Sequence, residues 1–469
     1  MKQELPKIIK YRILKSSLIV LLGIACFSIF IACNEDDIPE IQDDTPELPK
    51  TIDENLYRFG VNTNPYEYFD INETPVPDGY TPFYISAYLR HGSRGNVGTN
   101  YAPVIEAFSN AHNVGVLNTE GERAFEQIKA IFALDNGTDG NLTARGAREH
   151  KQIANRMFSK YRNLFLSGTS RIRAVSSTSP RCQESMNAFI DELNLLNSQL
   201  YVDSYTGNQY MAYMSSAAPA EVKAVASEKY KEYLSLHDPD TTYFASHVFS
   251  DMDAGRDAIG GSIEKVMSGV MSFAAISGAY DLDKTLINLF QIEDLRHYSR
   301  ALSQYIYICQ CNSIEYGNLS MAVRGVGALI EDFVDKTDSV ILEGEYVADL
   351  RFGHDSQLMS FCAKIGLKGI GERLSIEEGS NWLGWLYTPF AANFYMVFYK
   401  NESGNVLVKC FINEHESTLL GLSGGPYYTW DNLKEYLNSL LLTPNTRGGI
   451  TDENNTSSDV NPDIIVPIQ

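Results

Sequence analysis

The 469-residue sequence lacks the patterns that bind metal ions or nucleic acids. Its 7 cysteines and 8 histidines show no spacing typical of metal ligands. Positive charge is scarce, with 38 lysines and arginines against 59 aspartates and glutamates and a net charge of −21. Such an acidic chain repels nucleic acid and anionic lipid surfaces. We therefore expect no metal, no cofactor and no nucleic-acid partner. A cleft that gathers arginines can still attract a small anion, because contact distances outweigh distant, screened charges.

One apolar run lies near the start of the chain, from Ser17 to Ala32, after five basic residues. It is too short to span a membrane comfortably. It ends at Cys33 with a small residue before the cysteine, which resembles a bacterial lipobox, although Phe30 departs from the usual leucine. We expect residues 1–32 to be a signal peptide and Cys33 to be lipidated. The alternative is a simple transmembrane anchor.

An acidic segment rich in proline and threonine, residues 33–52, follows this cysteine. No packed core can form from that composition, so we expect a disordered tether between a membrane lipid anchor and the folded part. Removal of residues 1–32 takes the net charge from −21 to −25. The acidic run resembles a surface-export signal of some Gram-negative lipoproteins, and a spacer for a periplasm-facing protein is the alternative. We expect an exported bacterial lipoprotein at the outer membrane, the cell surface or the periplasm.

The run Arg90–Arg94 (Arg-His-Gly-Ser-Arg) follows an alternating apolar segment, 82–89, that we expect to be a strand. Two arginines that flank a histidine can grip phosphate oxygens with their planar N–H forks. Gly92 allows close backbone approach. A neutral imidazole beside that clamp can attack phosphorus and form a phosphohistidine. The alternatives are a surface basic cluster or a buried structural histidine.

Two further segments carry residues of the same chemistry. Residues 171–177 read as a strand, and Ser179 and Pro180 then begin a helix whose first turn holds Arg181, near the anion-binding end of the helix. The dipeptide His354-Asp355 follows another expected strand, 346–352, and a glycine that breaks it. A second pair, His237-Asp238, precedes a proline, and we interpret it as part of a loop.

These three elements, in this order, resemble the signature of the histidine acid phosphatases, a family that includes phytases and multiple inositol polyphosphate phosphatases. The resemblance spans roughly residues 82–415. It implies that His91 is the nucleophile and that Asp355 is the proton donor. It also implies four phosphate ligands, which are Arg90, Arg94, Arg181 and His354. Because Asp355 must carry a proton to act as an acid, activity should favour acidic pH.

The substrate preference rests on smaller similarities. The His-Asp pair is typical of phytases and acid phosphatases, whereas residues 388–393 and Asn413-Glu414 look more like inositol polyphosphate phosphatases. We expect phosphomonoester hydrolysis with phytate or another inositol polyphosphate as substrate. A broad-specificity acid phosphatase is the close alternative, and a non-catalytic surface lipoprotein that binds phosphorylated ligands is an alternative of another class. A relative of phosphoglycerate mutase is disfavoured by the export signal and the His-Asp donor.

We expect an α/β fold with a mostly parallel sheet flanked by helices, like that of phosphoglycerate mutase, and with an inserted helical cap. Strands are also expected at 393–400 and 405–412, joined by a hairpin. The expected organisation is a signal peptide (1–32), a tether (33–52), a first core part (53–200), a helical cap (201–340), a second core part (341–442) and a disordered tail (443–469).

Overall fold

The computed structural model describes residues 60–441 except 167–169, 216, 318–319 and 321–324. The expected signal peptide, the tether with its lipidated Cys33, and the tail from 443 lie outside the described residues. Within the described part, no helix is both long enough and apolar enough to cross a membrane.

One mixed sheet forms the core of the described chain. Its strands are β1 (Thr81–Arg90), β2 (Arg171–Ser176), β3 (Tyr201–Thr206), β4 (Ala348–Gly353), β5 (Asn393–Lys400), β6 (Val406–Ile412), β7 (His415–Ser417) and β8 (Tyr427–Thr429). The order across the sheet is β3-β2-β4-β1-β5-β6-β7, and β8 also pairs with β6. The strands β1 to β4 pair in parallel, and β5 to β8 extend the sheet in antiparallel fashion. The expected mostly parallel centre and the expected β5–β6 hairpin are both confirmed.

The sheet is buried on both faces, which follows from the side-chain alternation of its central strands. In β1, Tyr84 and Tyr88 pack in one core, whereas Ile85, Ala87 and Leu89 pack in the core on the opposite face. The strand β5 divides its side chains between the same two cores. Both faces therefore need a cover of helices.

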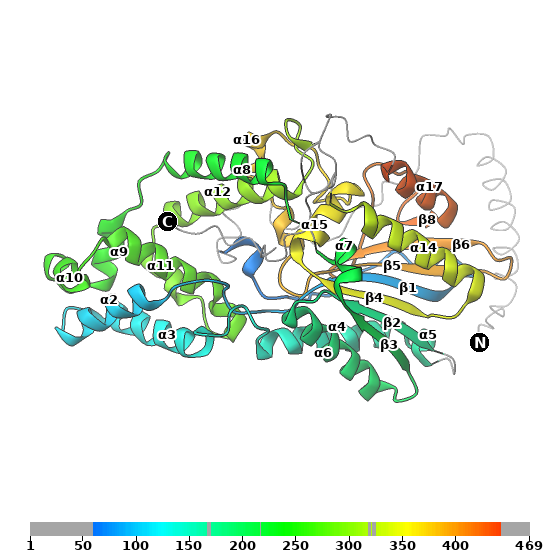
Figure 1. Ribbon diagram of the computed structural model, residues 1–469, viewed down its shortest axis with the longest axis horizontal. Coiled ribbons are helices and arrows are strands. Elements are labelled where there is room, and N and C mark those ends of the chain that lie inside the picture. Colours follow the sequence, from blue (N-terminus) through cyan, green and yellow to red (C-terminus); the bar gives the residue numbers. More distant parts are fainter. Residues whose placement is uncertain (1–59, 167–169, 216, 318–319, 321–324, 442–469) are drawn as a thin grey trace, which may run out of the picture. The chain divides into compact units, whose positions relative to one another are not determined.

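The helices supply that cover in two layers (Figure 1). The face of Ile85 is covered by α4 (Ala144–Lys160), α5 (Arg162–Leu166) and α6 (Pro180–Leu196). The face of Tyr84 is covered by α7 (Met211–Met214), α14 (Gly327–Glu343), α15 (Asp355–Lys364) and α17 (Trp430–Leu441).

A second group of helices has an apolar core of its own, and Figure 1 shows them gathered beyond one end of the strands. They are α2 (Ala102–Asn113), α3 (Thr119–Asp135), α9 (Thr241–Val248), α10 (Met252–Ile259) and α11 (Ile263–Ile276). Three further helices, α8 (Ala220–Leu234), α12 (Ile292–Gln310) and α16 (Ile376–Gly379), pack around a smaller apolar cluster. Short 3-10 turns are η2 (Val61–Thr63), η3 (Asn208–Tyr210), η4 (Ser277–Tyr280), η5 (Thr285–Leu289) and η7 (Gly384–Tyr387).

This helical group differs from the expected cap, 201–340, at two places. Helices α2 and α3 come from the segment after β1, yet their apolar faces pack against α9 and α11 in one core. The segment Tyr201–Thr206 instead forms β3, at the edge of the sheet beside β2. The helical group is thus built from two insertions, one after β1 and one after β3.

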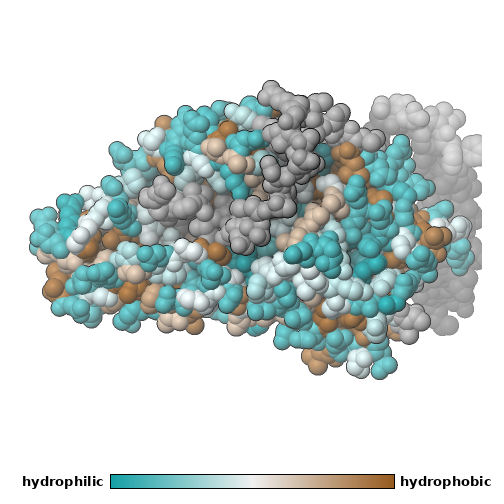
Figure 2. Space-filling model, in the orientation of Figure 1, coloured by the Kyte–Doolittle hydropathy of each residue, from teal (hydrophilic) through white to brown (hydrophobic). Residues whose placement is uncertain are grey.

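The face of the molecule in Figure 2 is mostly hydrophilic, with hydrophobic residues in small scattered groups. The five cysteines of the described chain are all buried and unpaired, and they are Cys182, Cys309, Cys311, Cys362 and Cys410. Burial raises the pKa of the Cys309 and Cys410 thiols to about 12, which keeps them protonated.

Candidate active site

The strands β1 and β4 end side by side and bring the two histidine motifs together. They run in parallel with Arg90 opposite Gly353, so the residues that follow each strand leave the same edge of the sheet. The amide of His91 donates to the Gly353 carbonyl at 2.9 Å. The rings of His91 and His354 lie edge to face with their centroids 5.7 Å apart. Two motifs far apart in the sequence therefore form one site at the carboxyl ends of the strands, where ligands bind in open α/β sheets.

The environment of His91 fixes its tautomer. The residue is fully buried, and its Nδ1 lies 2.9 Å from the Gly92 carbonyl oxygen. A carbonyl oxygen can only accept, so Nδ1 carries the ring proton. The lone pair of the neutral ring is then on Nε2. The ring also lies 6.0 Å from that of Phe390, which limits its rotation.

Close packing holds the loop that follows His91. The Gly92 amide donates to the Ser185 hydroxyl of α6 at 3.0 Å. A Cβ atom on Gly92 would lie 2.4 Å from the backbone oxygen of Gly146 in α4, so only glycine fits there. Thr143 caps α4 and donates its hydroxyl to the Ser93 carbonyl at 3.0 Å, which joins the start of this helix to the loop.

A buried carboxylate, Glu149, braces the same loop from α4. It accepts hydrogen bonds from the Ser93 amide at 2.8 Å, the Ser93 hydroxyl at 2.7 Å and the Tyr66 amide at 3.1 Å. Desolvation by burial raises the pKa of Glu149, and the hydrogen bonds from Ser93 oppose that effect. The next residue, His150, is fully buried against Phe352, and desolvation lowers its pKa to about 3. We infer that His150 is a neutral packing residue below the site.

Arg90 is completely buried and is held by three protein oxygens. Its Nη1 donates to the carbonyls of Asn62 at 2.5 Å and Thr388 at 2.7 Å. Its Nη2 lies 3.3 Å from Oδ2 of Asp355. The guanidinium also lies over the Phe390 ring, 4.6 Å from its centroid. Such a fixed guanidinium presents its charge in one place, but some of its N–H groups already donate to protein oxygens.

Arg94, like Arg90, is buried near the Phe390 ring. It is 2% exposed, and its Nη1 donates to the Gly95 carbonyl at 2.6 Å. Its guanidinium carbon lies 5.8 Å from the Phe390 centroid. The buried carboxyl of Asp135 accepts from the Tyr280 hydroxyl at 2.5 Å. Desolvation by burial raises the pKa of Asp135, and the Tyr280 hydrogen bond and the Arg94 charge oppose that effect. The Asn96 amide donates to the same carboxyl at 3.1 Å, which ties the loop after His91 to α3 of the helical group.

His354 and Asp355 begin α15, with His354 as the N-cap residue. The His354 amide donates to the Tyr88 hydroxyl at 2.9 Å, and its Nε2 lies 3.1 Å from the Ser177 hydroxyl. Its Nε2 also lies 3.7 Å from the Cys182 sulfur in the first turn of α6. Both α6 and α15 thus begin at the site, where their positive helix ends favour an anion.

Arg181 precedes Cys182 in this first turn of α6. Its carbonyl accepts from the Ser185 hydroxyl at 2.7 Å, and that hydroxyl also binds the Gly92 amide. Ser179 is the N-cap residue and Pro180 begins the helix, as the sequence predicted, although the serine hydroxyl makes no capping hydrogen bond. The Arg181 backbone is therefore linked to the loop after His91.

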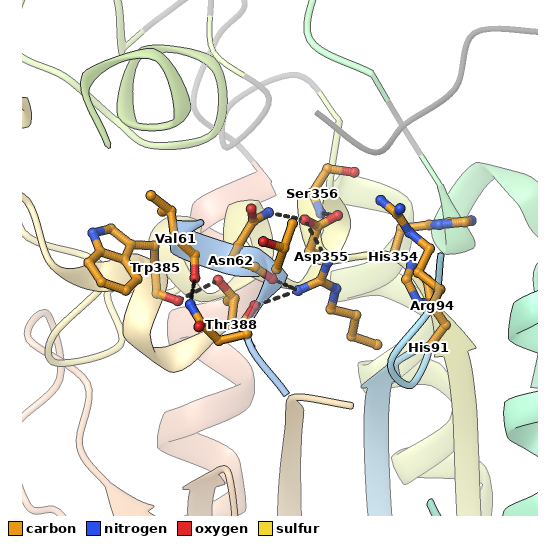
Figure 3. A network of polar contacts seen from close by, with 12 residues as sticks. Val61, Asn62, His91, Arg94, His354, Asp355, Ser356, Trp385 and Thr388 are labelled. Carbon is orange, nitrogen blue, oxygen red and sulfur yellow. Dashed lines mark hydrogen bonds and ion pairs between the residues drawn. The ribbon is translucent and has the colours of Figure 1, made fainter. Parts of the chain in front are cut away.

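The Asp355 carboxyl is surrounded by donors (Figure 3). The Asn62 carboxamide donates to Oδ2, and the Ser356 amide donates to Oδ1 at 2.8 Å. Together with Arg90, these groups fix both oxygens of a side chain that is 2% exposed. Figure 3 shows His91, Arg94 and His354 on one side of this carboxyl and Asn62 and Thr388 on the other. The carboxyl thus lies between these two sets of side chains (Figure 3).

The structure brings all six predicted site residues to one edge of the sheet and adds others that sequence reasoning missed. The missed residues are Asn62, Tyr88, Glu149, Ser177, Thr388 and Phe390. Tyr88, Ser177, Thr388 and Phe390 lie in segments that the sequence singled out, whereas Asn62 and Glu149 do not. The second His-Asp pair lies elsewhere, where His237 contacts Asp294 at 2.6 Å. Within the described ranges, no group of three or more histidine, cysteine or acidic side chains could hold a metal ion.

No protein-family model matches the chain, and no curated protein matches it by sequence. Several solved structures do match the fold of the chain. The apo multiple inositol polyphosphate phosphatase of Bifidobacterium longum superposes with a TM-score of 0.61 at 18% identity, over 81% of this chain and 97% of that one. The chain has the histidine acid phosphatase fold. The Bifidobacterium enzyme in complex with inositol hexasulfate gives a TM-score of 0.59 at 20% identity, over 81% of this chain and 97% of that one. The phytase from D. castellii superposes with a TM-score of 0.58 at 14% identity, over 83% of this chain and 86% of that one.

The histidine acid phosphatase fold agrees with the resemblance drawn from three short motifs. At these identities the likeness concerns the fold.

Proposed function

We propose that the protein is a phosphomonoesterase that hydrolyses inositol polyphosphates, phytate foremost, through a phosphohistidine on His91. The observation that carries the proposal is the shared strand edge, where the ring of His91, with its lone pair on Nε2, lies 5.7 Å from that of His354 and in the same group of side chains as Asp355 (Figure 3). A nucleophile, a proton donor and arginine clamps are the parts that phosphoryl transfer requires.

In the first step, Nε2 of His91 attacks phosphorus in line and the bond to the leaving oxygen breaks. Arg90, Arg94 and Arg181 balance the charge on the phosphoryl oxygens as it shifts to the leaving group. His354 contributes a further hydrogen bond to the phosphoryl group. The Nδ1–H bond to the Gly92 carbonyl stabilises the positive charge that the ring acquires.

Asp355 gives its proton to the leaving alkoxide, so it must be protonated when the substrate binds. In the second step, water attacks the phosphohistidine and Asp355 takes a proton from that water, which restores both residues. Activity should therefore be higher at acidic pH.

Inositol polyphosphates are the proposed substrates because two lines of support agree. The segments 388–393 and 413–414 resemble those of inositol polyphosphate phosphatases, and the first of them contacts Arg90 through Thr388. The structurally similar Bifidobacterium enzyme has been crystallised with inositol hexasulfate, a mimic of phytate.

The test measures phosphate release from phytate and from p-nitrophenyl phosphate across acidic to neutral pH. Wild type and His91→Ala are compared. A strong preference for phytate supports the proposal, and equal turnover of both substrates points to a broad-specificity acid phosphatase. Binding of phytate without turnover of either substrate would replace the enzyme by a phosphate-binding lipoprotein.

We further propose that the protein is exported and anchored to a membrane by a lipid on Cys33. The basic start, the apolar run and the small residue before Cys33 support this. Metabolic labelling with a radioactive fatty acid should label the wild type, and Cys33→Ala should abolish the label. Protease treatment of intact cells would then tell surface exposure from a periplasmic location.

A further inference from the structure

A short segment that precedes the first strand contacts the proton donor. Residue Asn62 lies in η2, is 3% exposed, and donates its side-chain amide to Oδ2 of Asp355. Its backbone carbonyl accepts from Arg90, whose other nitrogen lies 3.3 Å from the same Oδ2. One residue thus contacts the acid directly and also holds the arginine that contacts it.

The segment around Asn62 is held firmly in an unusual conformation. Val61 has a φ of 56°, in the left-handed region that β-branched residues rarely adopt, and Gly60 before it has a φ of 99°. The Asn64 side chain donates to the Val61 carbonyl at 2.5 Å and accepts from Lys284. The Asn64 carbonyl accepts from the Phe390 amide at 2.8 Å. These contacts aim the Asn62 amide at Asp355.

We propose that Asn62 is the positioning residue for the proton donor, which deepens the proposed function and rests on it. Asp355 has to be an acid in the first step and a base in the second. A carboxamide suits both states, because its NH₂ donates to a carboxylate and its oxygen, after rotation of the amide, accepts from a protonated carboxyl. An apolar side chain can serve neither state, and a second carboxylate would add a negative charge beside the acid.

The proposal predicts a dependence on the leaving group. A nitrophenolate leaves without help, whereas an alkoxide needs the proton. Asn62→Ala should lower kcat/KM for glycerol 2-phosphate by about tenfold or more, while p-nitrophenyl phosphate changes by less than about threefold. In an Asp355→Asn background, Asn62→Ala should cause no further change in the ratio of the two substrates.

A second variant, Asn62→Asp, is almost the same size and tests the proposal through pH. Two facing carboxyls share a proton, so the acid stays protonated to higher pH. The limb of the rate profile that falls as pH rises should move to higher pH. Asn118→Asp is the control, because this partly buried asparagine caps α3 and makes its hydrogen bonds within the helical group. It should keep the wild-type substrate ratio and pH profile, whatever it does to the melting temperature.

The full-length protein is assayed in each case, and the outcomes separate the two proposals. The role of Asn62 is overturned if the wild type turns over both substrates and Asn62→Ala lowers kcat/KM equally for both. It is also overturned if Asn62→Asp keeps the wild-type pH–rate profile. In either case the proposed phosphatase activity still holds. If the wild type releases phosphate from neither of these substrates nor from phytate, the proposed function fails and takes this inference with it.

Discussion

Arg90 and Asp355 form a buried ion pair at the ends of two adjacent parallel strands, with 3.3 Å between Nη2 and Oδ2. The strand β1 supplies the arginine just before the nucleophile, and β4 leads into the carboxyl. Loss of one partner from such a pair leaves a buried charge without compensation, which is costly. Substitutions of Asp355 must therefore keep an acceptor for Arg90 if they are to report on chemistry.

The variant Asp355→Asn meets that condition, because the carboxamide oxygen can still accept from Arg90. It should inhibit proton transfer and leave phosphate binding intact. We expect kcat for an alkyl phosphate to fall by about 10²- to 10⁴-fold, with a smaller fall for p-nitrophenyl phosphate. The inhibition constant of inorganic phosphate should change little. Normal hydrolysis of phytate by this variant would show that another group is the acid.

The His91→Ala variant should lose turnover of every substrate by roughly a thousandfold or more, since no other side chain replaces Nε2. A brief reaction with ³²P-labelled substrate, quenched in alkali where phosphohistidine survives, should label the wild type and not the variant. His237→Ala is the control, because this histidine belongs to the other His-Asp pair and contacts Asp294. Label on His91→Ala would contradict a phosphohistidine at this position.

The parts of the site that sequence reasoning predicted are those at strand ends. Alternation of apolar residues marked the strands, and a polar motif directly after a strand has to lie at the sheet edge. The expected strand 393–400 agrees with β5, Asn393–Lys400. The parallel pairing of β1 with β4 then brings His91 beside His354, which the family resemblance implied and the spacing alone could not show.

Other features had no periodic signal to reveal them. Asn62 lies in a 3-10 turn beside a left-handed valine, where no helix or strand pattern applies. The strand β3 lies at the sheet edge with mostly exposed side chains, so its sequence carries little apolar alternation. The packing of α3 against α9 joins segments that are far apart along the chain, and a single sequence does not indicate such a pairing.

Gly92 offers a test of how tightly the nucleophile loop is packed. In Gly92→Ala the new methyl group would lie 2.4 Å from the Gly146 backbone oxygen, which cannot move without displacing α4. We expect activity to fall by about tenfold or more and stability to fall by roughly 1–3 kcal/mol, as for other overpacked sites. Gly261→Ala is the matched control, because its nearest neighbour is 3.8 Å away. Thermal unfolding and p-nitrophenyl phosphate turnover measure both effects, and an active, stable Gly92→Ala would contradict the packing argument.

The adjacent residues Glu149 and His150 should impose opposite pH dependences on stability. Burial lowers the pKa of His150 from 6.5 to about 3, so the unfolded chain binds a proton in this range that the folded protein does not. Its contribution to stability is thus lost as pH falls from about 6.5 towards 3, at roughly 1.4 kcal/mol per pH unit within the window. Burial raises the pKa of Glu149, so its contribution is present below the ordinary value of 4.5 and is lost as pH rises through the raised value.

Urea unfolding at a series of pH values between 4 and 7 separates the two contributions. His150→Gln removes a group that destabilises the protein in acid, so the free energy of unfolding should change less between pH 7 and pH 4 than in the wild type. Glu149→Gln removes a group that favours the folded state in acid. The change in the free energy of unfolding between pH 7 and pH 4 should therefore be larger than in the wild type. The comparison uses the slope with pH, because either substitution also changes stability at neutral pH. Parallel curves for wild type and His150→Gln would mean that this histidine titrates alike in the folded and unfolded protein, which would contradict its place as a neutral, buried ring.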